Sequence, residues 1–215
     1  MAATPDVAVV DYGAGNVRSV AKALERSGSR VRVTGEPAAV RAADAVVLPG
    51  AGAFADAMAS LAARGLDAAV RESVAAGTPY LGLCVGLQLL FEESDEHGPA
   101  AGLGLLRGRV ERFPDRDADG ALLRVPHMGW NEVSFEARHP VLDGLPERDV
   151  FYFVHGYRAV PVEGRDTVGR SEYGGDFAAA VARDNVFAVQ FHPEKSQDSG
   201  RRLLDRFVTW VSACA

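Results

Sequence analysis

The chain has 215 residues, of which 47% are hydrophobic and 24% are charged, and its formal net charge is -6. This length and composition predict one globular domain over residues 1–215, and the acidic balance without a lysine- and arginine-rich run argues against nucleic acid as a partner. No stretch approaches the ~18 consecutive apolar residues of a membrane span, and no export signal is recognisable, so we expect a cytoplasmic protein without a membrane partner.

The first hundred residues alternate short apolar runs with helical patterns. The run DVAVVDYG (6–13) ends at a glycine and is typical of a strand buried on both faces, and residues 16–28 then predict a helix. The alternation predicts right-handed crossovers and an open, mostly parallel α/β sheet flanked by helices. The later pairs of strand and helix are 30–34 with 36–43, 44–50 with 53–77, and 78–84 with 86–94.

After residue 100 the pattern becomes strand-like, with polar turns and little helix. It predicts an antiparallel extension of the same sheet in the second half of the chain. The last segment, 199–215, predicts an amphipathic helix whose apolar face carries Leu203, Leu204, Phe207, Val208 and Val211. The predicted strands of the second half lie at 104–113, 130–135, 150–160, 177–185 and 186–193.

Cys84 stands between two glycines in GLCVG (82–86), where a predicted strand meets a predicted helix. The spacing resembles a nucleophile elbow with sulfur in place of oxygen, and the helix start would favour the thiolate. The N–H of Val85 could stabilise an oxyanion there. The alternative is a buried structural cysteine in the sheet core. Since Cys214 lies at the chain end, we expect no disulfide and a reducing compartment.

A nucleophilic cysteine needs a base, and the chain has five histidines. His97 and His139 lie in polar or proline-flanked segments and are expected to be solvated loop residues. His127 and His155 lie beside aromatic residues, where a hydrogen-bonded packing role is at least as good an interpretation as chemistry.

His192 differs because it ends the apolar run VFAVQF and is followed by Pro193 and Glu194. The proline turn would bring the carboxylate within reach of one imidazole nitrogen. Cys84 and His192 would then converge at the carboxyl edge of a parallel sheet, where open α/β folds place their sites.

Two glycine-rich turns complete the pattern. The turn in LPGAGAF (48–54) follows a predicted strand and can present backbone N–H groups to a carbonyl oxygen or carboxylate. The turn DYGAGN (11–16) begins like a dinucleotide loop, but Arg18 stands where the third glycine is needed, so we do not expect nucleotide binding.

Three motifs, PGAGAF (49–54), GLCVGLQLL (82–90) and QFHPEKS (190–196), together resemble the class I (triad) glutamine amidotransferases. Within that family, the segments 11–16, 126–133 and 152–159 are similar to the glutaminase subunits of imidazole glycerol phosphate synthase in histidine biosynthesis.

The resemblance implies a class I glutamine amidotransferase fold and hydrolysis of L-glutamine to glutamate and ammonia, without a cofactor or a metal. Cys84 would be the nucleophile, His192 the base and Glu194 its orienting partner. The N–H groups of Val85, Ala51 and Gly52 would form the oxyanion hole. The residues implied to bind glutamine are Gln88, Glu96, Gly52 and Tyr157. For Gln88 and Glu96, an ordinary polar residue on a helix surface is the alternative.

The resemblance also implies a partner, the (β/α)8-barrel cyclase subunit, with which the chain would form a heterodimer. The cyclase uses ammonia to form imidazole glycerol phosphate and an aminoimidazole carboxamide ribonucleotide. Asn16, Trp130, Tyr152 and Lys195 match positions that face this partner. The alternatives are core packing for the two aromatic residues and solvation for Asn16 and Lys195.

Two other functional classes remain to be weighed. A free-standing cysteine hydrolase would need loops that cover its own substrate, and no long insertion follows either motif. A non-catalytic interaction module would have no reason to carry Cys84, His192 and Glu194 together. Release of ammonia from glutamine distinguishes the three classes.

Overall fold

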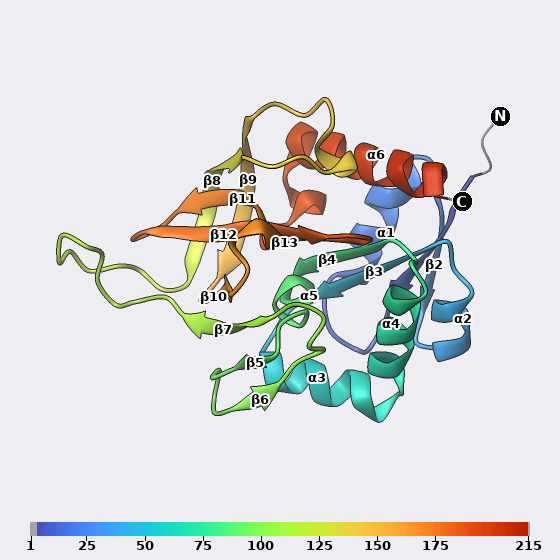
Figure 1. The fold of residues 1–215 in the computed structure, drawn as a ribbon, viewed down its shortest axis with the longest axis horizontal. Helices are drawn as coiled ribbons and strands as arrows, with labels where there is room; N and C mark the ends of the chain where they lie inside the picture. The colour runs from blue at the N-terminus through green and yellow to red at the C-terminus, as the bar shows by residue number, and fades with distance from the viewer. Residues whose placement is uncertain (1–3, 215) are drawn as a thin grey trace.

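The computed structural model describes residues 4–214, and across them the strands form a nine-stranded mixed sheet and a four-stranded sheet (Figure 1). The large sheet has the order β2-β1-β3-β4-β13-β12-β11-β8-β9. Its parallel half consists of β2 (Arg30–Thr34), β1 (Asp6–Val10), β3 (Ala45–Gly50), β4 (Tyr80–Cys84) and β13 (Val186–Val189). Its antiparallel half adds β12 (Asp176–Arg183), β11 (Thr167–Glu172), β8 (His127–Phe135) and β9 (Arg148–His155). The predicted parallel sheet with an antiparallel extension is confirmed.

Burial explains the apolar runs of the parallel strands. Residues of β3, β4 and β13 are buried without exception, because helices cover both faces of the sheet. The edge strand β2 is different, because Arg30 and Arg32 are exposed. Both arginines form ion pairs with Asp6 of the neighbouring strand β1. Charged side chains of this kind discourage an exposed edge from pairing with another strand.

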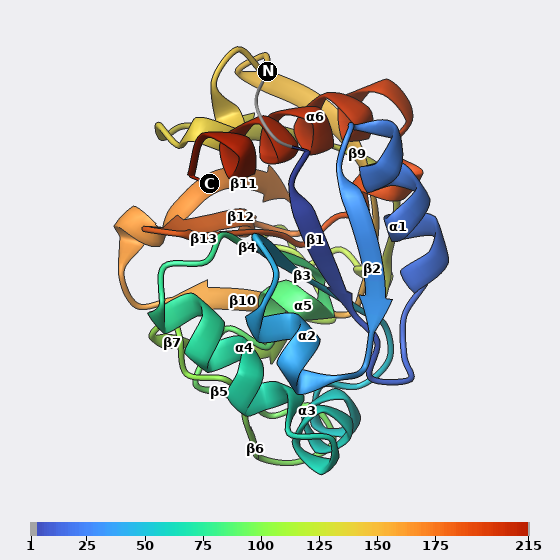
Figure 2. The same cartoon turned by 90° about the vertical axis from the view of Figure 1, so that its right-hand side faces the viewer.

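The helices lie in two layers, which Figure 2 shows on opposite sides of the parallel strands. One layer holds α1 (Val17–Arg26) and α6 (Gln197–Cys214), and the other holds α2 (Pro37–Arg41), α3 (Phe54–Ala63) and α4 (Leu66–Ala75). The predicted apolar face of the last helix is buried against the sheet. Within residues 4–214 no helix combines the length and the apolar character that a membrane crossing requires.

The helix predicted over residues 86–94 is wrong beyond its first turn. Only α5 (Val85–Gln88) forms there. The carbonyls of residues 89–92 accept hydrogen bonds of 2.8 to 3.2 Å from N–H groups of residues 102–106, and so they are not available to continue the helix. Gly102 permits this approach, since a Cβ at that position would lie 2.2 Å from the carbonyl oxygen of Phe91.

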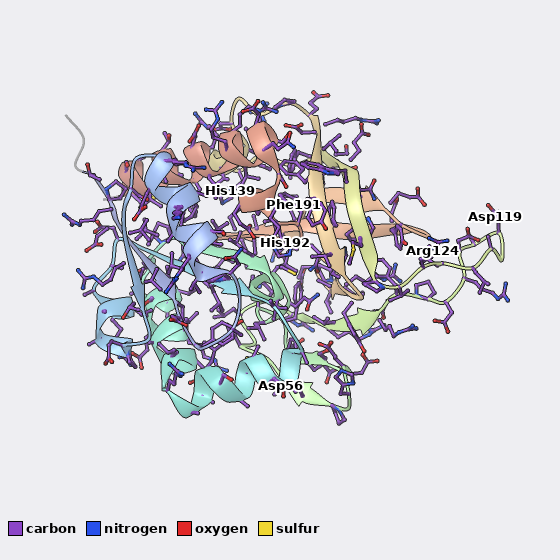
Figure 3. All side chains as sticks on the ribbon, turned by 180° about the vertical axis from the view of Figure 1, so that it is seen from behind. Asp56, Asp119, Arg124, His139, Phe191 and His192 are labelled. Atoms are coloured by element: carbon purple, nitrogen blue, oxygen red, sulfur yellow. The ribbon has the colours of Figure 1, made fainter. Side chains whose placement is uncertain are left out.

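A second, smaller sheet was not predicted. It has the order β10-β7-β5-β6. Its strands are β10 (Tyr157–Pro161), β7 (Gly108–Arg112), β5 (Glu93–Ser94) and β6 (Ala100–Ala101). The single strand predicted over 150–160 is therefore two strands, because the chain leaves the large sheet at His155 and joins the small one at Tyr157. Beyond β7, a loop carrying Asp119 and Arg124 projects from the body of the molecule (Figure 3).

Three short 3-10 turns complete the described chain: Pro140–Leu142, Gly164–Asp166 and Pro193–Lys195. His139 precedes the first of them, and the prediction that it is a solvated loop residue is wrong. Its ring is stacked on Phe187 and packs edge-on against Trp210, and its Nδ1 accepts the N–H of Val141 at 3.2 Å. The aromatic partners come from distant segments, so the local sequence could not reveal them.

Candidate active site

Cys84 and His192 come from neighbouring parallel strands that end at the same edge of the sheet. Cys84 is the last residue of β4, and His192 lies three residues beyond the end of β13, in the middle of the molecule in Figure 3. Both line a pocket of about 230 Å³. The pocket lining is Gly50, Ala51, Gly52, Cys84, Val85, Gln88, Glu96, Val154, His155, Gly156, Tyr157, His192 and Lys195. The predicted oxyanion-hole and substrate residues are therefore gathered around the two.

Cys84 occupies a tight turn between β4 and α5, as the spacing of its glycines predicts. Its backbone has φ 53° and ψ -108°, a conformation that non-glycine residues rarely adopt and that costs on the order of 1–3 kcal/mol. Gly86 is required by close packing, since a Cβ there would lie 1.8 Å from the carbonyl oxygen of Leu48 in β3. Gly82 is also packed closely, since a Cβ there would lie 2.6 Å from the carbonyl oxygen of Gly86.

The imidazole of His192 is oriented by Glu194. Nδ1 of His192 lies 2.9 Å from Oε1 of Glu194, and the carboxylate side chain is almost completely buried. Among residues 4–214, Nε2 of His192 has no hydrogen-bond partner. Burial lowers the pKa of His192, but Cys84 and the carboxylate of Glu194 together favour the imidazolium more strongly and raise that pKa to about 9. This arrangement favours a proton on the imidazole at neutral pH.

Two buried amides connect Cys84 with the other side of the pocket. Nε2 of Gln88 lies 3.1 Å from the carbonyl oxygen of Tyr157 and 3.1 Å from Oε1 of Gln190. Nε2 of Gln190 lies 3.6 Å from the sulfur of Cys84. The alternative for Gln88, a polar residue on a helix surface, is excluded because only 3% of the residue is exposed. Sequence reasoning missed Gln190, although its position two residues before His192 in an extended segment was the available signal.

The glycine turn at 50–52 lies directly beside the cysteine turn. Gly50 pairs with Cys84 in the sheet register, and a Cβ at Gly50 would lie 2.5 Å from the Cβ of Val85. Ala51 and Gly52 are exposed at the pocket, and Gly52 has φ 94°. Which N–H groups receive the oxyanion stays a prediction.

Glu96 and Tyr157 lie on the pocket wall formed by the small sheet and its loops. Oε2 of Glu96 accepts the N–H of Phe54, the first residue of α3, at 2.7 Å. The carboxylate therefore links the pocket to the helix that follows the glycine turn. Burial raises the pKa of Tyr157, and the nearby carboxylates of Glu96 and Asp95 add to that effect.

The predicted partner residues fall into two places. Trp130 on β8 is 49% exposed and packs edge-on against Tyr152 on β9, with ring centroids 5.9 Å apart. Nζ of Lys195 lies 6.0 Å from the centre of the Tyr152 ring. Trp130 is therefore a surface residue, and core packing does not account for it. Asn16 is exposed and caps α1, where its Oδ1 accepts the N–H of Ser19 at 3.4 Å.

His127 and His155 form a buried pair, which agrees with the hydrogen-bonded packing role. Nδ1 of His155 donates to the carbonyl of Tyr157 at 2.8 Å, and its Nε2 lies 3.0 Å from Nδ1 of His127. Burial lowers the pKa of His127 to about 4. Burial likewise lowers the pKa of His155 to about 3, and the neighbouring His127 and His192 contribute to the decrease. Both rings are therefore neutral at physiological pH.

Comparisons with known proteins show the family of the chain. The family model for glutamine amidotransferase class-I matches residues 8–210. The chain is 52% identical over 211 residues to the imidazole glycerol phosphate synthase subunit HisH of Aromatoleum aromaticum, with 96% of this chain and 99% of that protein covered. Identity to the subunit HisH of Geobacillus thermodenitrificans is 51% over 206 residues, with 96% of each chain covered.

Solved structures show the same fold. A structure described as glutamine amidotransferase matches with a TM-score of 0.73 and 22% identity over 96% of this chain and 98% of its own. A chain of PurLQS from Thermotoga maritima matches with a TM-score of 0.75 and 21% identity over 97% of this chain and 99% of its own. At this level of identity the likeness concerns the fold alone.

Proposed function

Because the chain belongs to the class-I glutamine amidotransferases, and within them to the family of the HisH subunits of imidazole glycerol phosphate synthase, we propose that Cys84 hydrolyses L-glutamine and that the ammonia passes to a cyclase partner. The observation that carries the proposal is the meeting of Cys84 with the His192–Glu194 pair in one pocket. A cysteine in a strained turn, a base, and an orienting carboxylate are the groups that acyl transfer by a thiolate requires.

In the proposed reaction, His192 holds as imidazolium the proton that it has taken from the Cys84 thiol, and the sulfur of the resulting thiolate attacks the side-chain amide carbon of glutamine. The negative charge on the carbonyl oxygen would be stabilised by the N–H of Val85 and by one from Ala51 or Gly52. The carbon–nitrogen bond then breaks, and Nε2 of His192 gives its proton to the leaving ammonia. A glutamyl thioester remains on Cys84.

Water completes the cycle. His192 takes a proton from the attacking water, the carbon–sulfur bond breaks, and glutamate leaves while Cys84 is regenerated. The raised pKa of His192 suits these roles, because the imidazolium that forms in each step is stabilised by Glu194.

The amino-acid end of glutamine would be bound at the other side of the pocket. The carboxylate of Glu96 is the acidic group among the lining residues, which suits the α-ammonium group of the substrate. The turn at Gly52 and the side chains of Gln88 and Tyr157 would complete this subsite. Since Glu96 also accepts the N–H of Phe54, substrate binding there would act on the start of α3.

For the partner we propose that the cyclase subunit docks over Trp130, Tyr152 and Lys195, with Asn16 in contact at the end of α1. Aromatic residues are enriched at protein interfaces, and Trp130 is exposed beside the half-buried Tyr152. Lys195 also lines the catalytic pocket, so a partner seated on it would cover the pocket mouth and keep ammonia from water.

The direct test is glutamate formation by the wild-type chain and by Cys84→Ala, each measured alone, with the cyclase, and with the cyclase and its ligand. We expect turnover that requires Cys84 and that rises when the cyclase and ligand are present. Cys84→Ala with the cyclase should still form imidazole glycerol phosphate when ammonium salt is supplied. Glutamate formation by Cys84→Ala at the wild-type rate would contradict the proposed nucleophile.

A further inference from the structure

We propose that Gln190 is a further catalytic residue, whose side-chain amide donates a hydrogen bond to the sulfur of Cys84 and stabilises the thiolate. The proposal rests on the proposed role of Cys84 as the nucleophile. It extends that role, because it assigns a buried side chain that contacts the sulfur.

The contact lies within the range of N–H to sulfur hydrogen bonds. Nε2 of Gln190 is 3.6 Å from Sγ of Cys84, and Gln190 is completely buried. A thiolate accepts hydrogen bonds more strongly than a thiol, so a donor held at the sulfur favours the charged form. In a buried setting this donor is not replaced by water, and it is in place before the reaction begins.

The neighbouring groups determine which end of the Gln190 amide faces the sulfur. The carbonyl oxygen of Tyr157 can only accept, so the group of Gln88 that faces it, at 3.1 Å, must be the NH2 group. The same NH2 group lies 3.1 Å from the Gln190 side chain, which must therefore present its oxygen. The NH2 end of Gln190 is then directed to Cys84.

The backbone anchor of this relay does not depend on the assignment of any amide. The carbonyl of Tyr157 also accepts Nδ1–H of His155 at 2.8 Å, so it receives two donors from two different elements. The chain of hydrogen bonds runs from Tyr157 through Gln88 and Gln190 to Cys84, and the side-chain oxygen of Gln190 faces Gln88 and not the sulfur.

A purely structural role for the Gln190 side chain would be the competing explanation. The backbone N–H of Gln190 already bonds to the carbonyl of Ala179 at 2.9 Å, which continues the pairing of β12 and β13 without the side chain. A structural amide exists at the other end of the same hairpin. There, Nδ2 of Asn185 bonds to the backbone carbonyls of Val74 and Thr78. Asn185 is therefore a matched control.

The test measures alkylation of Cys84 by iodoacetamide as a function of pH, which requires no glutamine turnover. All variants carry Cys214→Ala, so that Cys84 is the single cysteine of the chain. Gln190→Met, which retains the length and removes the donor, should lower the alkylation rate at pH 7 about tenfold, as expected for a lost hydrogen bond to a charged group. The midpoint of the pH profile should move to higher pH.

Further variants separate the relay from packing. Gln88→Met leaves Gln190 in place but removes the group that orients its amide, so its alkylation rate should fall to an intermediate value. Asn185→Leu should lower the melting temperature, because it removes two hydrogen bonds to backbone carbonyls, but its alkylation profile should match that of the wild type. Gln190→Leu repeats the first substitution with a different shape, and thermal unfolding verifies that each variant is folded at the assay temperature.

Wild-type alkylation profiles in folded Gln190→Met or Gln190→Leu would overturn the proposal. An equal change in Asn185→Leu would also overturn it, because the effect would then follow from general loosening of the hairpin. If Gln190→Met shifts the profile while the wild-type chain makes no glutamate with its cyclase, the inference about Gln190 stands and the proposed glutaminase function fails.

Discussion

Glu194→Gln tests how strongly the carboxylate of Glu194 stabilises the protonated form of His192. The substitution retains the shape of the side chain and removes its negative charge, 2.9 Å from Nδ1 of His192. Within the described chain, the second carboxylate oxygen has no hydrogen-bond partner. No described group at the position of that oxygen would therefore hold the amide of a glutamine in one orientation. The glutamine can turn either its oxygen or its nitrogen toward the imidazole of His192.

The expected size of the effect follows from the pKa of His192, which is raised from 6.5 to about 9. Cys84 and Glu194 are the groups that raise it against burial, and Cys84 is the larger contributor. We expect the substitution to lower the pKa of His192 by about one to two pH units, which corresponds to about 1.4 to 2.7 kcal/mol. If the transition state carries the imidazolium, kcat should fall about tenfold to a hundredfold.

The assay is steady-state glutamate formation across pH 6 to 10, with the cyclase and its ligand present. The wild type should retain a protonated His192 up to about pH 9. The variant should lose this proton at lower pH, so the alkaline limb of its pH–rate profile should move to lower pH. Glu92→Gln is a matched control, because its carboxylate accepts a backbone N–H from Gly108 outside the pocket. A Glu194→Gln enzyme with the kcat and alkaline limb of the wild type would refute the reasoning.

Three other predictions concern stability and assembly. The pKa values of His127 and His155 are lowered in the folded state, so the unfolded chain binds more protons between pH 6.5 and about 4. The free energy of unfolding, measured with urea, should therefore fall by roughly 3 to 6 kcal/mol on acidification through that window, and by less in His127→Asn. Gly86→Ala should destabilise the fold by about 2 kcal/mol or more, because its Cβ would meet a β3 carbonyl, whereas Gly164→Ala has open space and should change the urea midpoint little. Trp130→Ala should weaken cyclase binding at least about tenfold by calorimetry without changing Cys84 alkylation, and unchanged affinity would contradict the proposed interface.

The parts of the fold that the sequence predicts well are those determined by neighbours in the chain. The turn at Cys84 follows from two glycines at the required spacing, and the buried strands follow from continuous apolar runs. The end of α5 after Gln88 depends instead on residues 102–106, whose N–H groups take the carbonyls that a longer helix would need. A local pattern contains no information about such a competitor.

The same distinction applies within the site. The pairing of His192 with Glu194 could be predicted, because the two are separated by one proline and a turn brings them together. The position of Gln190 at the sulfur of Cys84 required the register between β4 and β13, which the sequence does not state. The burial of His139 could not be predicted either, because the aromatic rings that cover it come from two segments distant in the sequence.

The strand that carries the proposed interface also borders the catalytic pocket. The carbonyl of Tyr152 accepts the N–H of His192 at 2.9 Å, and its N–H donates to Oγ of Ser196 at 2.9 Å. Oγ of Ser196 in turn donates to the carbonyl of His192 at 2.7 Å, so both the N–H and the carbonyl of His192 are bonded to this short network. Two residues further along the strand, Val154 lines the pocket. A cyclase that packs on Trp130 and Tyr152, as proposed, would therefore contact the segment that positions His192, and partner binding would have a direct structural route to the proposed catalytic base.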